Sequence, residues 1–475
     1  MRRRSLIPFF ACGAVSTAVT LATVSWLLHD ERHPPAHRVI TMAMNAGEDP
    51  AGGPTSWDTI QESQFRNYAQ KQGWADVAFV MRTFVGSDTE KYVAAQIAGA
   101  GPDIVIASRE QLAFFDDQGL IEPLDGYLEQ WSDYQDGQLD LEVLDACRGR
   151  GGEVLGLPVY ENAPGVFAVR RDWLDKLGRA PPRTFDEARD YWRACTFEDP
   201  DGNGRRDTYG YELTMDSDGG HLYSLAPFLF AVRAPWYRRD EERGYVAAFN
   251  TPAAARVLEF IRDCYREGLF GDDVMVRPPG SATYRFFARR RSGMTGPVFA
   301  DWYRSVAEQN GMIDRVQVVP FLWPDDQARR TDTYGACTYL TRLRCMMKAS
   351  RDKQLSWRYF EYFFSREWMG RSFDHHSQPY LRGDHLGHFG LYSTETPWRP
   401  LRRDVSTRQR IDPKLARQVE QVDPYVIRVP LMASWPRASS AICEVIVDFY
   451  NDRYPTAAEA LDEAERRFDA ILRGP

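Results

Sequence analysis

The stretch from Tyr92 to Ile106, YVAAQIAGAGPDIVI, combines a helix, a turn and a strand. Ser87 to Glu90 offer a helix start with acidic side chains in the first turn, and Gly99 to Pro102 end that helix. Ile104 to Ile106 then form an apolar run typical of a buried strand. A helix that turns sharply into a buried strand predicts an α/β sheet.

The segments on either side continue this alternation. Predicted strands cover Val39–Met44, Val77–Phe84, Val166–Val169 and Val316–Val319. Predicted helices cover Trp57–Gln72, Gln111–Gln118, Phe185–Cys195, Pro252–Glu267, Ser356–Arg371 and Ala457–Leu472. Thr456 and Glu459 form a capping box at the start of the last helix. Neither an internal repeat nor a low-complexity block interrupts the pattern, so we expect one body built of interleaved α/β lobes.

The overall composition excludes several classes of protein. The chain has 475 residues, of which 43% are hydrophobic and 27% charged, as in ordinary globular proteins. Its formal net charge is -8, from 59 Lys and Arg against 67 Asp and Glu. Nucleic-acid binding relies on clustered surplus cations, so this balance argues against a nucleic-acid partner.

The N-terminal segment, residues 1–32, predicts export. Arg2 to Arg4 are followed by an uncharged stretch from Leu6 to Leu28. This stretch is longer than the apolar part of a typical cleavable signal and long enough to span a bilayer as a helix. The preceding cations orient the rest of the chain outward. We therefore expect a retained anchor at the outer face of the membrane, with a cleaved signal or lipidation at Cys12 as the alternatives.

The cysteines show no pattern of a small-scaffold disulfide framework. Disulfides are possible outside the cytoplasm, but the spacings contain no CxxC pair. Buried free thiols are the favoured interpretation. The seven are Cys12, Cys147, Cys195, Cys264, Cys337, Cys345 and Cys443.

Five blocks, taken in order, resemble the extracellular solute-binding protein family 1, the maltose-binding-like lipoproteins that serve carbohydrate ABC importers. The first is Tyr92–Ile106, with its Gly-x-x-Pro-Asp turn into a strand. The others are Gly119–Asp125, Gly156–Pro158 with Val166–Leu174, Pro182–Glu187 and Tyr454–Phe468. Together they span nearly the whole exported part of the chain.

The resemblance implies a type II periplasmic-binding-protein-like fold, with two lobes of mixed sheet flanked by helices and joined by a hinge. By correspondence the first lobe holds residues 38–164 and 333–375, and the second holds 165–332 and 376–475. The ligand cleft would lie between them, and hinge closure would hide the ligand from water. The implied partners are an oligosaccharide or other small solute and the permease subunits of an ABC transporter.

The segment DPDGNGRRD, residues 199–207, has the spacing of a calcium-binding loop. Its expected oxygen donors are the side chains of Asp199, Asp201, Asn203 and Asp207 and the backbone carbonyl of Arg205. Position twelve is Gly210, which cannot supply the usual bidentate carboxylate, although Glu212 or a remote residue could replace it. We predict a structural calcium ion here; the alternative is a polar turn without an ion.

Sugar sites combine aromatic faces with planar polar groups placed at strand ends and loops. Residues of these types follow predicted strands in both lobes or lie at the first crossover. The candidates are Asn45, Glu48, Ser108, Tyr160, Glu161, Asn162, Trp236, Tyr237, Asp301, Trp302 and Trp323. For each single aromatic residue, core packing is the competing interpretation.

Three function classes remain at this point. Ligand capture for import is favoured, and no catalytic residues are predicted. A secreted polysaccharide hydrolase is the first alternative, against which the chain has no G-x-S-x-G, H-E-x-x-H or P-loop motif. A binding protein coupled to a membrane sensor is the second, and an uncleaved anchor would suit it.

Overall fold

The structure is a computed structural model of the chain. It describes residues 38–46, 56–74, 77–85, 89–149, 151–158, 160–161, 165–213, 215, 220–240, 242, 244–271, 274, 281–299, 307, 310–319, 322–324, 336–337, 343–370, 399–405, 417, 420, 426–427, 432 and 434–473. The candidates Glu48, Asn162, Asp301 and Trp302 and the N-terminal segment lie outside these ranges. In the described part of the chain no helix is both long and apolar enough to cross a membrane.

The first lobe is built on a four-stranded sheet of order β12-β3-β1-β2. β1, β2 and β3 are parallel, and β12 runs antiparallel to β3. The strands are β1 (Arg38–Ala46), β2 (Val77–Val85), β3 (Ile104–Ala107) and β12 (Leu343–Met346). The helices are α2 (Ser56–Lys71), α3 (Thr89–Ile97), α4 (Arg109–Asp117), α5 (Asp125–Leu128), α6 (Ser132–Gln135), α7 (Leu141–Asp145) and α14 (Lys353–Phe363).

The second lobe is built on a four-stranded sheet of order β10-β5-β9-β6. Its strands are β5 (Gly165–Arg170), β6 (Tyr209–Glu212), β9 (Ser292–Phe299) and β10 (Val316–Val319). A hairpin of β7 (Tyr237–Asp240) and β8 (Gly244–Ala247) lies apart from this sheet. The helices are α8 (Arg171–Leu177), α9 (Phe185–Phe197), α10 (Gly220–Ala231), α11 (Pro252–Arg266), α12 (Ser281–Arg289), α17 (Trp435–Tyr450) and α18 (Ala457–Arg473).

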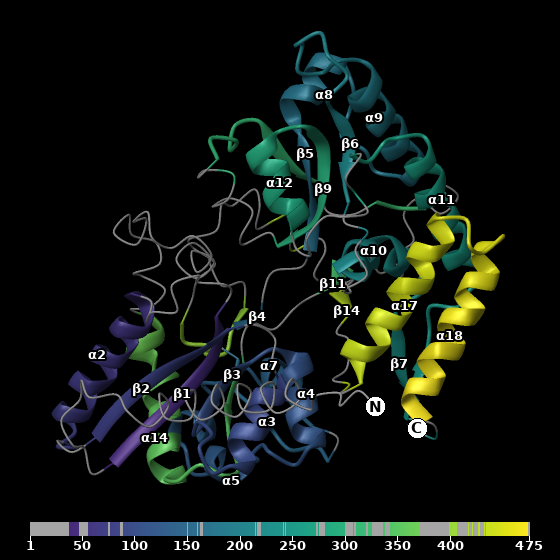
Figure 1. Ribbon diagram of the computed structural model, residues 1–475. Helices are drawn as coiled ribbons and strands as arrows, with labels where there is room; N and C mark the ends of the chain where they lie inside the picture. Colours follow the sequence, from purple (N-terminus) through teal and green to yellow (C-terminus); the bar gives the residue numbers. More distant parts are fainter. Residues whose placement is uncertain are drawn as a thin grey trace, which may run out of the picture.

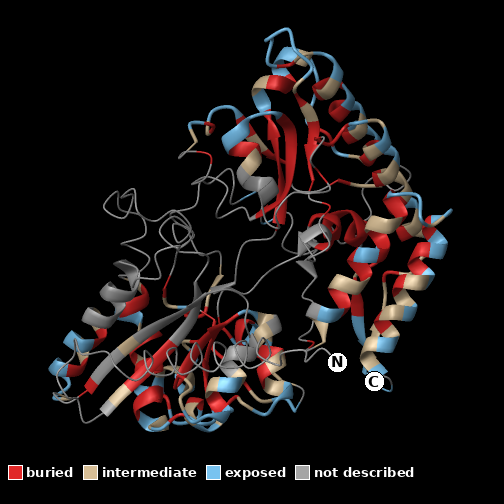
Figure 2. Cartoon of the chain, in the orientation of Figure 1, coloured by how far each residue is buried: buried red, intermediate tan, exposed pale blue. Residues whose placement is uncertain are grey.

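The two lobes have separate hydrophobic cores, which confirms the predicted two-lobed α/β fold. Figure 1 shows the sheets as two bodies, with α17 and α18 packed on the second, and Figure 2 shows the buried residues concentrated inside each body. One core gathers residues of β3, α4, β12 and α14. The other gathers residues of β5, α9, α10, α11, α17 and α18. Separate cores allow each lobe to move as a unit.

The chain passes between the lobes several times. β4 (Tyr160–Glu161) precedes β5 by a few residues and pairs with β13 (Arg399–Pro400). Before β12, β11 (Ala336–Cys337) pairs in parallel with β14 (Val426–Ile427). Both lobes are therefore assembled from segments that are distant in sequence.

One predicted boundary is wrong. Residues 376–475 were expected to belong wholly to the second lobe, but Leu401 and Val405 are buried in the core of the first. Backbone hydrogen bonds join Asp140 to Leu401 and Arg403 to Gln138. The first lobe therefore includes a third segment, residues 399–405.

The predicted helix Ser356–Arg371 is also interrupted. α14 ends at Phe363, and the helical turns resume at 366–370. Between them the Ser365 hydroxyl accepts a hydrogen bond from the Trp368 amide at 3.2 Å, as a helix N-cap does. Serine competes with the helix backbone in this way, so the apolar periodicity continues across a break in the helix.

The turn that carries Asp103 holds three segments of the first lobe together. The Asp103 carboxylate accepts hydrogen bonds from the Thr41 amide at 2.9 Å and the Thr41 hydroxyl at 2.7 Å. It also accepts from the Ser350 hydroxyl at 3.2 Å and from the Arg351 amide and guanidinium, both at 2.9 Å. β1, the start of β3 and the segment after β12 thus meet at one buried side chain.

These bonds favour the charged form of Asp103. Burial of the carboxylate acts to raise its pKa, but the hydrogen bonds from Arg351 and Thr41 outweigh that effect and hold the pKa below its usual value. Folding lowers the pKa of this carboxyl group. Its charged form therefore stabilises the folded state at any pH above the pKa of the unfolded chain. That stabilisation is lost as the pH falls through the folded value.

We expect Asp103→Asn to lower the free energy of unfolding by about 3 kcal/mol at pH 7, since it leaves buried donors facing an amide. The difference from the wild type should be constant above about pH 5 and shrink below about pH 4. Urea unfolding across this pH range measures it. Asp136→Asn, at an exposed position of the same lobe, is the control and should change stability by less than about 0.5 kcal/mol. A loss of stability in Asp103→Asn that does not change with pH would contradict this role of the Asp103 carboxylate.

Candidate functional site

The carboxyl ends of the parallel strands in the first lobe lie at one edge of the sheet. Met44 pairs with Ile106 in the last register position between β1 and β3. Asn45 and Ala107 come next, and Ser108 follows β3 directly. Ligands of open α/β sheets bind outside the carboxyl ends of the strands, so this edge is where a ligand site is expected.

The same edge is where the chain leaves the first lobe and returns to it. Leu343, the first residue of β12, pairs with Ala107, the last residue of β3. Leu157 and Arg344 exchange backbone hydrogen bonds at 3.0 Å shortly before the chain passes to β4 and β5. The crossovers therefore start from the edge that carries Asn45 and Ser108, so this edge faces the second lobe.

The second lobe presents a matching edge. β5 begins at Gly165, which pairs with Phe299 at the end of β9. β10 runs antiparallel to β5, so its last residue, Val319, lies opposite Phe167 near the same end. The crossover edge of this sheet thus carries the ends of β9 and β10.

Two of the predicted ligand residues, Asn45 and Ser108, are brought to this edge. Ser108 is exposed and is the N-cap of α4: its hydroxyl accepts a hydrogen bond from the Gln111 amide, and the Gln111 side chain accepts one from the Ser108 amide. This capping box accounts for the serine without a ligand. The N-terminus of α4 nevertheless lies at this edge.

The crossover candidates are placed by their backbone. Tyr160 and Glu161 form β4, which pairs with Pro400 and Arg399 at the rim of the first lobe. Asp301 and Trp302 follow β9, which ends at the crossover edge of the second lobe. Together with Glu48 and Asn162, these two residues lie outside the described ranges, so their assignment to the site stays a prediction.

Trp236 and Tyr237 are not cleft residues, and their prediction as ligand contacts is wrong. Each side chain is only 4% exposed. Trp236 packs on Phe249, with ring centroids 6.1 Å apart, and Tyr237 packs on Trp435 at 4.9 Å. The preceding residues form α10, buried in the second lobe, and the β7–β8 hairpin then packs under α18. These aromatic side chains serve the core.

Trp323 is half-buried and lies beside the start of α9. Its amide donates to the Arg183 carbonyl at 2.8 Å, and its carbonyl accepts from the Phe185 amide at 3.0 Å. α9 begins near the crossover edge and ends at the far pole, because the loop that follows it leads into the start of β6. Trp323 is therefore on the cleft side of the second lobe, and its contact with a ligand stays a prediction.

The predicted calcium loop lies at the far pole of the second lobe, away from the crossover edge. The Asp199 carboxylate accepts hydrogen bonds from the amides of Gly202, Asn203 and Gly204 at 3.0, 3.1 and 2.9 Å. The Asn203 amide group donates to Asp201 at 2.9 Å and to Asp207 at 3.1 Å. The acidic side chains thus converge on Asn203.

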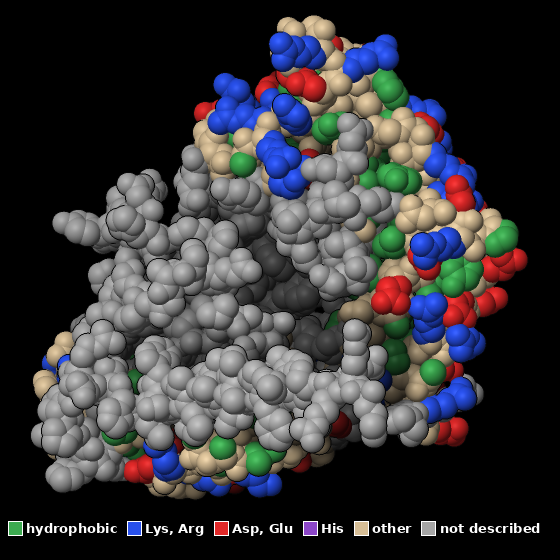
Figure 3. Space-filling model, in the orientation of Figure 1, with side chains coloured by type: hydrophobic (Ala, Val, Ile, Leu, Met, Phe, Trp, Pro, Cys, Tyr) green, Lys and Arg blue, Asp and Glu red, His purple; other side chains and the backbone are tan. Residues whose placement is uncertain are grey.

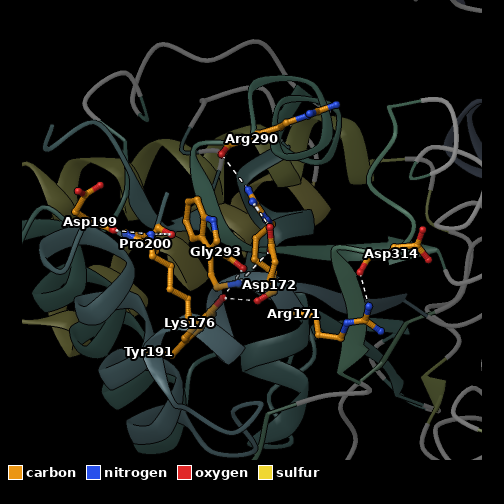
Figure 4. A network of polar contacts seen from close by, with 11 residues as sticks. Arg171, Asp172, Lys176, Tyr191, Asp199, Pro200, Arg290, Gly293 and Asp314 are labelled. Carbon is orange, nitrogen blue, oxygen red and sulfur yellow. Dashed lines mark hydrogen bonds and ion pairs between the residues drawn. The ribbon is translucent and has the colours of Figure 1, made fainter. Parts of the chain in front are cut away.

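The surroundings of this loop explain its departure from a complete calcium motif. A Cβ at Gly210 would lie 2.1 Å from the Trp192 Cβ, so position twelve has no room for any side chain. Glu212 does not replace it: this carboxylate is buried and bonds Arg285 at 3.1 Å and Ser292. Figure 4 shows the Lys176 ammonium directed at the carbonyls of Asp199 and Pro200, the latter at 2.8 Å.

The electrostatics of the loop reflect its crowded carboxylates. Partial burial and the neighbouring Asp199 carboxyl raise the pKa of Asp201, while hydrogen bonds from backbone amides, that of Gly204 foremost, lower the pKa of Asp199. Within the described ranges no group of three or more His, Cys, Asp or Glu side chains has the geometry of a metal site. The oxygen donors fit calcium in type, and hydrogen bonds hold them in their present arrangement.

Sequence reasoning missed two arginines of the first lobe. The Arg344 guanidinium is buried and lies 3.3 Å from the centroid of the Phe363 ring. Arg402 is 2% exposed and bonds Asp133, Asp404 and the Phe364 carbonyl. Arg402 gave no sequence signal because it lies in no helix or strand, and Arg344, although it is part of β12, looks in sequence like any basic residue of a short strand.

The profile of the bacterial extracellular solute-binding proteins matches residues 63–370, almost two thirds of the chain. The chain belongs to this family. The match covers the predicted Gly-x-x-Pro-Asp turn, the first crossover and most of the second lobe, and it confirms the family resemblance and the fold drawn from the five sequence blocks.

Curated relatives are similar over part of their length. Lipoprotein LipO of Bacillus subtilis (strain 168) is 27% identical over 197 residues, which is 40% of this chain and 38% of LipO. The polygalacturonan/rhamnogalacturonan-binding protein YtcQ of the same organism is 45% identical over 44 residues, 9% of each chain. The chain therefore spans well under two thirds of the length of these relatives.

Solved structures share the fold over nearly the whole chain. A solute-binding protein from Thermotoga lettingae TMO, bound to α-D-tagatose, has a TM-score of 0.67 at 18% identity and covers 92% of this chain and 100% of its own. Maltose-bound MalE3 of T. maritima has a TM-score of 0.67 at 16% identity, covering 90% and 99%. Lmo0181 of Listeria monocytogenes, with cycloalternan, has 0.67 at 14%, covering 92% and 99%. At these identities the likeness shows the fold.

Proposed function

We propose that this protein captures a carbohydrate, taken up as an oligosaccharide, by closing its two lobes around it. The observation that carries the proposal is the pair of facing sheet edges, each bearing strand ends and crossover segments, between two separately packed cores. Such an edge pair makes a crevice whose walls come from different rigid bodies. Solved structures of the same fold hold α-D-tagatose, maltose and cycloalternan.

Delivery to an ABC importer and retention at the outer face of the membrane complete the proposal. The family to which the chain belongs consists of extracellular solute-binding proteins, which supports a location outside the cytoplasm. The cationic start and the uncharged stretch Leu6–Leu28 support an anchor, and one relative is a lipoprotein. Permease subunits are the partners that a captured solute would require.

A panel of sugars tests capture directly. α-D-Tagatose, maltotriose, cycloalternan and trigalacturonate are added to the exported chain, and the melting temperature is measured. We expect at least one to raise it by several degrees, because a ligand at a hundred times its Kd adds about 2.7 kcal/mol to the stability of the folded state. Chromatography of the same mixtures should return every sugar intact. Cleavage would show a hydrolase, and no shift with any sugar would count against a carbohydrate ligand.

We also propose that the loop 199–207 binds a calcium ion with a structural role. Support comes from the spacing of the oxygen donors in the sequence and from the oxygen-bearing side chains of Asp201 and Asp207, which converge on Asn203. Asp199, Asp201, Asn203 and Asp207, with the Arg205 carbonyl, would hold the ion. The ion would pin the loop between α9 and β6.

Chelation tests the calcium proposal. Removal of calcium with EGTA should lower the melting temperature by a few degrees, and added calcium should restore it. Asp201→Asn should remove this dependence, whereas Asp240→Asn, in the β7–β8 hairpin of the same lobe, should keep it. Equal melting temperatures with and without calcium in the wild type would leave a polar turn as the correct description.

A further inference from the structure

Residues 399–405, called the strap here, cross the rim of the first lobe between two other parts of the chain. At one end Arg399 and Pro400 pair antiparallel with Glu161 and Tyr160 of β4. Farther along, the Asp140 amide donates to the Leu401 carbonyl at 2.7 Å, and the Arg403 amide donates to the Gln138 carbonyl at 2.8 Å. The strap thus joins the loop before α7 to the first crossover.

Two arginines fasten the strap to the first lobe. Arg399 forms a fork with both oxygens of Asp140, at 2.7 and 3.0 Å, and reaches Glu142 at 2.8 Å. Asp140 is also the N-cap of α7 and is itself buried. Bidentate guanidinium–carboxylate pairs are among the strongest hydrogen-bonded contacts in proteins, so Arg399 is held to a fixed helix end.

Arg402 makes a deeper attachment. Its guanidinium bonds Asp133, takes both oxygens of Asp404 at 2.8 and 2.9 Å, and donates to the Phe364 carbonyl at 3.0 Å. Its side chain is 3% exposed, and the neighbouring Leu401 is in the core of the first lobe. An arginine with this many partners in a buried position is costly to move, because its removal leaves buried acceptors unpaired.

β4 by contrast has only this partner strand in the described part of the chain. It is two residues long, and its sheet consists of β13 and β4 alone. Three residues beyond β4 the chain enters β5 of the second lobe. The contacts that fix β4 to the first lobe therefore determine where the rigid part of that lobe ends along the first crossover.

We propose that the strap is this fixing device, and that Arg399 and Arg402 are positioning residues that hold the first crossover on the rim of the first lobe. The strap thereby fixes the first-lobe end of this crossover at Glu161. The candidate ligand residues Tyr160 and Glu161 stay with the first lobe as the lobes move. The role of the strap in lobe movement rests on the proposed capture function, because only lobe closure on a ligand gives the hinge a use. The strap lies beyond residues 63–370, so it is outside the part of the chain matched by the family profile.

Hydrogen exchange and solution scattering of the full exported chain, without any ligand, test the proposal. In Arg399→Met and Arg402→Met we expect the amides of residues 160–161, 399 and 401–403 to exchange about tenfold faster than in the wild type, with β1 and β3 unchanged. Small-angle X-ray scattering should show a broader distribution of interatomic distances, because a longer hinge samples more lobe orientations.

Arg285→Met is the matched control. Arg285 of α12 pairs with Glu212 of β6 in the second lobe, with side chains 14% and 5% exposed, and neither residue belongs to β4 or to the strap. It should lower stability without changing either readout at the crossover. If Arg402→Met does not fold, Arg399→Met decides, since Arg399 is 27% exposed.

Unchanged exchange at β4 would overturn the proposal, and so would faster exchange at β4 with scattering equal to that of the control. Neither measurement needs a sugar, so a failure of the strap proposal and a failure of carbohydrate capture would be told apart.

Discussion

The first lobe depends on the buried carboxylate of Asp103. A buried charge is tolerated only where it is paired and hydrogen-bonded, and the partners of Asp103 come from three separate stretches of chain. Thr41 is 62 residues away in sequence and Arg351 is 248. The lobe is therefore complete only when the chain has left it, built much of the second lobe and returned.

This discontinuity produces the functional architecture. A chain that leaves a lobe and returns must cross between the lobes, and here the crossovers start beside the carboxyl ends of β1 and β3. Parallel strands bring polar residues to that edge, and the second lobe meets it with the ends of β9 and β10. The crevice, the hinge and the candidate ligand residues thus follow from one topological fact.

Over the face shown in Figure 3 the described basic and acidic side chains are interspersed on α17 and α18, as on a solvated surface.

The elements with local signals were predictable from sequence. The Gly-x-x-Pro-Asp turn, the Val316–Val319 strand and the capped helix that starts at Phe185 have the positions expected, because caps, turns and apolar periodicity are local properties.

The site was only partly predictable. Asn45 and Ser108 lie at the expected edge, since strand ends can be read from the pattern. Trp236 was misassigned because an aromatic side chain after an apolar run looks the same whether it faces a core or a crevice. The strap was missed because its place depends on Asp133 and Asp140, more than 250 residues earlier.

The central claim is that the two lobes close on a solute, and the distance between them tests it most directly. Spin labels are placed on cysteines introduced at Glu129 of the first lobe and Arg256 of the second, both exposed. Five native cysteines are buried: Cys147, Cys195, Cys264, Cys345 and Cys443. Pulsed dipolar spectroscopy then gives the distance distribution with and without a sugar that binds. The account predicts a broad distribution that shifts and narrows on binding. A distribution that stays the same when the sugar is bound would contradict it.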